Sequence, residues 1–146
     1  TYCHRTHSFL AEELGVSEAV VPALLDNIDS APIDARLRPI LRYVRKLTLT
    51  PSRLVEADAA AVYDVGWNSE ALFHAIAIAA YFNFCNRITA GAGLDVPDTT
   101  LREAAKQLAE QVDGLDQRDM IEFVKVTLNK LTDNYFMVFS QGKFAE

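Results

Sequence analysis

The stretch from Ala71 to Cys85, ALFHAIAIAAYFNFC, is the most apolar part of this 146-residue chain. Its apolar residues recur at steps of three and four, which predicts an α-helix beginning at Asn68 or Ser69 and stopping near Gly91. The alanines along it permit close contact with neighbouring helices. We therefore expect a buried helix at the centre of an all-α core.

Polar residues and overall composition exclude several classes of protein. His74 and Asn83 interrupt the apolar stretch before it reaches the roughly 18 residues of a membrane span, so no membrane partner is expected. Half of the residues are hydrophobic and 23% are charged, as in a folded domain. The net charge of −6 and the lack of a basic stripe argue against a nucleic-acid partner. Two cysteines and no apparent signal peptide predict a cytoplasmic protein.

Working outward from the central stretch, the same helical periodicity continues and no strand is predicted. Ser17 and Asp34 are expected to cap the helices that follow them. The predicted flanking helices cover about residues 3–14, 18–28, 35–47, 56–64, 101–111 and 118–140.

Two of these helices have surfaces that suggest a partner. The helix after Asp34 carries a basic face, which is either a solvated surface or a site for an anion or partner; its residues are Arg36, Arg38, Arg42, Arg45 and Lys46. The helix over 118–140 has a heptad-like apolar seam that predicts docking on the domain or on another subunit. The seam consists of Ile121, Val124, Leu128, Leu131, Tyr135 and Val138.

The candidate chemistry lies at the start of the sequence. Cys3 and His7 are four residues apart, so on a helix they share one face within reach of each other. An imidazole there can take the thiol proton, and a helix N-terminus favours the resulting thiolate. His4 is adjacent and can tune the site. We expect Cys3 as nucleophile and His7 as its base.

Other interpretations of these residue types stay open. Cys3, His4 and His7 could ligate zinc, although a fourth ligand is not evident. A cysteine one residue before Thr1 would complete a haem-attachment pattern. Cys85 is expected to be a buried, inert thiol, and a pairing with Cys3 depends on proximity. His74 is either a core histidine, or it lines the pocket or contacts the catalytic residues without touching substrate.

Two segments carry a resemblance to a known family. The first is Tyr2-Cys3-His4-Arg5-Thr6-His7, which resembles the Cys-x-x-Cys-x-x-x-His motif of the alkylhydroperoxidase D-like / carboxymuconolactone decarboxylase superfamily. The second runs from Leu37 to Leu94 and is similar to the peroxidase-related branch. Its matching pieces are Leu41–Thr48, Pro51, Val65-Gly66-Trp67, Tyr81–Ile88 and Gly93-Leu94.

The resemblance implies an all-α, alkylhydroperoxidase D-like helical bundle at 1–94 with a C-terminal helical extension at 95–146. Cys3 takes the place of the second motif cysteine and His7 that of the motif histidine, with Tyr2 directly before the cysteine as a supporting residue. The first motif cysteine would fall one residue before Thr1, and the family's glutamate further upstream. Homo-oligomers, as dimers, trimers or hexamers, are implied as well.

The function that follows is a thiol-dependent peroxidase or thiol–disulfide oxidoreductase. Its expected partners are a peroxide substrate and a thiol reductant, lipoyl or thioredoxin-like, and neither a cofactor nor a metal is expected. Two alternatives remain: a non-redox enzyme of the carboxymuconolactone decarboxylase type, and a helical oligomerisation protein without catalysis.

Overall fold

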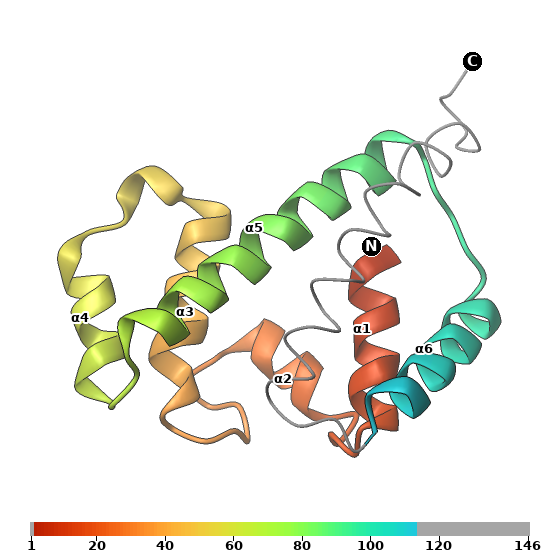
Figure 1. Ribbon diagram of the computed structural model, residues 1–146, viewed down its shortest axis with the longest axis horizontal. Helices are drawn as coiled ribbons and strands as arrows, with labels where there is room; N and C mark the ends of the chain where they lie inside the picture. Colours follow the sequence, from red (N-terminus) through yellow and green to blue (C-terminus); the bar gives the residue numbers. More distant parts are fainter. Residues whose placement is uncertain (1, 114–146) are drawn as a thin grey trace. The chain divides into compact units, whose positions relative to one another are not determined.

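The computed structural model describes residues 2–113, apart from the side chain of Tyr2, and Figure 1 shows the arrangement of its helices. Within these residues every regular element is helical, which confirms the predicted all-α class. The helices are α1 (Tyr2–Glu13), α2 (Val20–Asp26), α3 (Leu37–Leu49), the 3-10 turn η1 (Pro51–Arg53), α4 (Glu56–Asp64), α5 (Ser69–Gly91) and α6 (Asp98–Val112). None of them is long and apolar enough to cross a membrane.

Two helices begin at a side-chain cap, and two other predicted caps are wrong. Helix α5 starts where the side-chain oxygen of Asn68 accepts a hydrogen bond from the Ala71 amide at 2.8 Å. Helix α4 has the predicted bounds, and its Asp58 carboxylate accepts the Val55 amide at 2.8 Å. The predictions that Ser17 and Asp34 cap the helices after them are wrong: α2 begins only at Val20 and α3 only at Leu37, and no side chain caps either helix. The Asp34 carboxylate instead accepts the Arg36 amide at 2.9 Å, one residue before α3.

The expectation of a buried helix holds for only part of the surface of α5. Leu72, Ala79 and Cys85 are buried, whereas Phe73 is 64% exposed and Ile78 is 52% exposed. The sequence pattern is apolar on more than one face of this helix. Hydropathy therefore located the helix but did not identify which face is covered.

The chain divides into two compact units. The described part of the first consists of residues 2–17 and 85–113, so residues on both sides of Leu94 belong to it. Within this unit α1 packs along α6 (Figure 1). Leu101 and Ala105 of α6 are buried, and the Arg5 guanidinium donates to the Asp98 carboxylate at 2.7 Å. These contacts hold the first turns of α1 in a fixed place.

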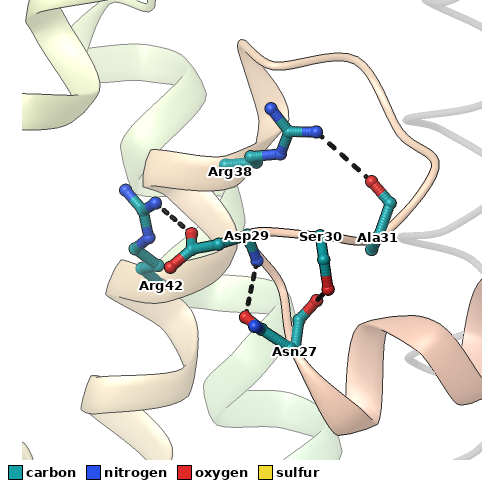
Figure 2. A network of polar contacts seen from close by, with 6 residues as sticks. All are labelled: Asn27, Asp29, Ser30, Ala31, Arg38 and Arg42. Carbon is teal, nitrogen blue, oxygen red and sulfur yellow. Dashed lines mark hydrogen bonds and ion pairs between the residues drawn. The ribbon is translucent and has the colours of Figure 1, made fainter.

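The second unit, residues 18–84, is held by polar contacts around α3. The indole Nε1 of Trp67 donates to the Arg36 carbonyl oxygen at 2.7 Å, and the Arg36 guanidinium lies 5.0 Å from the Trp67 ring centroid. The loop before α3 is tied to that helix by Arg38, which donates to the Ala31 carbonyl at 3.3 Å (Figure 2). The loop backbone polar groups thereby gain partners.

The predicted helix over residues 118–140, with its apolar seam, lies outside the described residues.

Candidate functional site: a buried thiol with a second thiol beside it

Cys3 lies in the first turn of α1, and its side chain is only 7% exposed. His7 follows one helical turn later, as predicted, and its ring is exposed. The His7 Nδ1 atom lies 2.7 Å from the Cys3 carbonyl oxygen, so Nδ1 is the protonated nitrogen and donates to this carbonyl. In the neutral ring Nε2 is then the basic nitrogen.

The Cys3 thiol has two neighbours on the last turns of α5, in the same compact unit. One is the Cys85 thiol and the other is the Thr89 side chain, and both affect the pKa of the Cys3 thiol. Cys85 and Thr89 are four residues apart and therefore share one face of α5. The Thr89 hydroxyl also donates to the Cys85 carbonyl oxygen at 3.0 Å. We call Cys3, Cys85 and Thr89 the thiol cluster.

Burial and charge decide the protonation of Cys3. Desolvation raises the pKa of the Cys3 thiol, the neighbouring Cys85 raises it further, and the hydrogen bond from Thr89 lowers it by less. The net pKa is above the ordinary value of a cysteine. At neutral pH Cys3 is therefore a thiol, and a reaction that uses its sulfur as nucleophile requires a base, the role predicted for His7.

Cys85 is 1% exposed, which confirms the predicted burial. Its position beside Cys3 was not deducible from the sequence, because the two cysteines are separated by most of the chain. Thr89 was missed altogether. Its only sequence signal is its spacing of four residues from Cys85, and that spacing has meaning only once α1 is placed against this face.

The remaining predicted site residues are less closely involved. His4 is exposed on α1, next in sequence to Cys3. His74 is exposed in the other unit and its ring centroid lies 6.1 Å from that of Phe73, so the prediction of a core histidine is wrong. The Tyr2 side chain is outside the described part of the structure.

A metal site has no support. Among the described residues, no three histidine, cysteine or acidic side chains converge as metal ligands, and this includes the alternative set of Cys3, His4 and His7.

A second candidate, the basic hollow, lies on α3 in the other unit. This open cavity has a volume of about 350 Å³ and is lined by Asn27, Ile28, Asp29, Arg42, Arg45, Lys46, Leu49 and Thr50. Two of the three cations that line it are paired with carboxylates. Arg42 is ion-paired with Asp29 (Figure 2), and the Lys46 ammonium lies 2.7 Å and 2.9 Å from the two Asp58 carboxylate oxygens.

The charges around the hollow stabilise one another. The hydrogen bond from Lys46, together with that from the Val55 amide, lowers the pKa of the Asp58 carboxyl. This arrangement favours the predicted solvated helix face over an anion site. Of the three cations that line the hollow, Arg42 and Lys46 are paired, and only Arg45 has no ion pair within residues 2–113.

Comparison of the chain with models of known protein families, with curated proteins and with solved structures found no match.

Proposed function

We propose that the protein is a thiol-dependent peroxidase or thiol–disulfide oxidoreductase in which Cys3 is the nucleophile and His7 the general base. The observation that carries this proposal is the thiol cluster: a sheltered thiol, one helical turn from an imidazole, next to a hydroxyl and a second thiol. The resemblance of the motif around Cys3 to the alkylhydroperoxidase D-like superfamily points the same way.

The chemistry assigns a task to each group. His7 Nε2 accepts the Cys3 proton, and the sulfur attacks one oxygen of a peroxide, ROOH. The O–O bond breaks, the sulfur becomes a sulfenic acid, and the leaving alkoxide takes the proton from His7 to give an alcohol, or water when the substrate is hydrogen peroxide. The sulfur loses two electrons and the peroxide gains them.

Because the pKa of Cys3 is raised, the thiol needs a base to become a nucleophile at neutral pH. A thiol that is protonated at neutral pH is protected from unspecific oxidation. It becomes nucleophilic only when the proton is removed in the presence of substrate. The Thr89 hydroxyl can rotate from the Cys85 carbonyl to the Cys3 sulfur, where it would donate a hydrogen bond to the thiolate as the thiolate forms.

The proposal is tested by peroxide consumption in the presence of a dithiol reductant. The wild-type chain is expected to consume hydrogen peroxide or an organic hydroperoxide catalytically, and Cys3→Ser is expected to abolish the activity while circular dichroism remains helical. Equal turnover by Cys3→Ser and wild type would overturn the proposal, because Cys3 could then not be the nucleophile.

A further inference from the structure

One face of α5 carries an exposed apolar stripe with a charged residue at each end. All six of its residues are exposed, and we call them the α5 stripe: Glu70, Phe73, Ala77, Ala80, Phe84 and Arg87. We propose that this stripe is the interface of a symmetric dimer, in which α5 of one copy packs antiparallel against α5 of a second copy. The inference concerns a surface and is independent of the chemistry proposed for Cys3.

The helix itself places these residues in one line. Helix α5 is continuous from Ser69 to Gly91 (Figure 1). Successive members of the α5 stripe are three, four, three, four and three residues apart, which is the spacing of side chains that line one face of a helix. Leu72 and Ala79, which are buried, lie on a different face. The stripe is therefore a continuous surface that a second helix can follow.

The middle of the α5 stripe has the composition of a contact surface. Phe73 is 64% exposed and Phe84 is 47% exposed, and the two alanines between them are exposed as well. Large apolar side chains grouped on one face mark sites of protein interaction. Because alanine has no side chain beyond Cβ, the axis of a partner helix can come close at Ala77 and Ala80. The partner must then offer small residues at the centre and large residues on both sides.

The α5 stripe has the shape that its own partner needs. Its spacing is the same in both directions, and its apolar residues are a phenylalanine, two alanines and a phenylalanine. In an antiparallel pair with a twofold axis midway between Ala77 and Ala80, Phe73 of each copy meets Phe84 of the other. The alanines of the two copies meet at the centre. Each contact occurs twice, as a twofold interface between identical surfaces requires.

The charges at the two ends favour a second copy in the antiparallel direction. In the same pairing, Glu70 of one copy meets Arg87 of the other at both ends of the interface. A parallel pair would instead bring two glutamates together and two arginines together, which is repulsive. Within one copy these residues are 17 positions apart, about 25 Å along the helix, so they cannot pair with each other.

The first test measures the assembly of the full chain by analytical ultracentrifugation over a wide range of concentration. A monomer–dimer equilibrium is expected. Phe73→Glu should raise its dissociation constant by about tenfold or more, because it removes both ring pairs and buries two charges in the interface. Ile78→Glu is the matched control. Ile78 is 52% exposed on the same helix but lies about 140° around the axis from Phe73, so this variant should dimerise as wild type does.

The second test reverses the charges at the ends. Glu70→Arg alone and Arg87→Glu alone should each weaken the dimer, because like charges then meet at both ends of the interface. The double reversal should restore it. Since the two residues of one copy are too far apart to touch, restoration reports a contact between copies. This test leaves the apolar residues unchanged, so it decides the question even if Phe73→Glu does not fold.

The outcomes separate this interface from other modes of assembly and from the proposed function. A monomer at every concentration, or an assembly with an odd number of subunits, would overturn the proposal. So would a dimer that Phe73→Glu and Ile78→Glu weaken equally, or one that neither single charge reversal weakens, since the interface would then lie elsewhere, such as on the predicted seam over 118–140. Cys3→Ser should dimerise as wild type does, so loss of peroxidase activity bears on the proposed function alone.

Discussion

The thiol cluster and the basic hollow differ in how their polar groups are satisfied. Around the hollow, strong charges are paired, Arg42 with Asp29 in an exposed pair and Lys46 with Asp58 in a half-buried one, so little charge is left for a ligand. In the cluster, weakly polar groups are buried: two thiols and the Thr89 hydroxyl. A high density of charge thus marks a structural surface here, while the residues of the proposed site lie in the region with little charge.

The largest effect after loss of Cys3 itself is expected for its base. His7→Gln should lower the rate of peroxide consumption by about 10²-fold, because general-base catalysis typically contributes at least that much. The matched control is His4→Gln: His4 is exposed and partly shares the face of His7, but it directly follows Cys3, so its side chain does not face that of Cys3 and its loss should change the rate little. Similar losses in both variants would show that the helix start, and not the imidazole at His7, is required.

The reactivity of Cys3 should depend on pH in the direction set by its raised pKa. Alkylation by iodoacetamide is expected to be slower than that of a free cysteine peptide at neutral pH, with a rate that rises only above the ordinary thiol range. Since the folded protein keeps this proton longer than the unfolded chain, stability should be constant below the ordinary thiol pKa and fall as pH rises through it. An alkylation midpoint below that of the free peptide would contradict the account.

A smaller effect is expected from the hydroxyl of Thr89. Thr89→Val keeps the branched shape and removes the hydrogen bonds, which should destabilise the protein by about 1 kcal/mol. Because the Thr89 hydrogen bond lowers the pKa of Cys3, its loss should move the alkylation profile of Cys3 to higher pH. Thr100→Val, which removes an exposed hydroxyl, should leave that profile unchanged.

In the hollow, Asp58→Asn should weaken acid resistance. The lowered pKa means that the Asp58 contribution to stability is present above the ordinary carboxyl pKa and is lost as pH falls through the lower folded value. The variant should be less stable at neutral pH and lose less on acidification, as measured by fluorescence of Trp67, the single tryptophan. A double-mutant cycle with Lys46→Met should show coupling; strict additivity would mean that the pair contributes nothing.

The smallest effect is expected for Arg45→Gln, at most about 0.5 kcal/mol in stability. Inorganic phosphate should give the wild type and this variant the same thermal midpoint. A phosphate-dependent stabilisation of the wild type that disappears in Arg45→Gln would identify the hollow as an anion site and reverse the comparison.

Sequence periodicity predicted the helices well, because each helix follows from the local spacing of apolar residues and from the capping and helix-breaking residues at its ends. Helix α4 has its predicted bounds, and Asn68 caps α5 as its side chain allows. Burial was predicted less well: Phe73 and His74 belong to an apolar stretch and yet are exposed, because the covered face of a helix depends on its neighbours.

The candidate site was half predictable for the same reason. Cys3 and His7 belong to one helical turn, and their spacing is legible in the sequence. Cys85 and Thr89 join them only through packing of distant segments, and no local pattern encodes that. The burial that raises the pKa of Cys3 is also a tertiary property, so the spacing of Cys3 and His7 could not predict the direction of this shift.

The most direct test of the account is the state of the tryptic peptide ending at Arg5 after the folded wild-type chain meets one equivalent of hydrogen peroxide. We expect Cys3 in this peptide to lose its alkylatable thiol, and to regain it with a dithiol reductant. A Cys3 that stays fully alkylatable, while a free cysteine peptide in the same solution is oxidised, would contradict the central claim that Cys3 is a peroxide-reactive thiol.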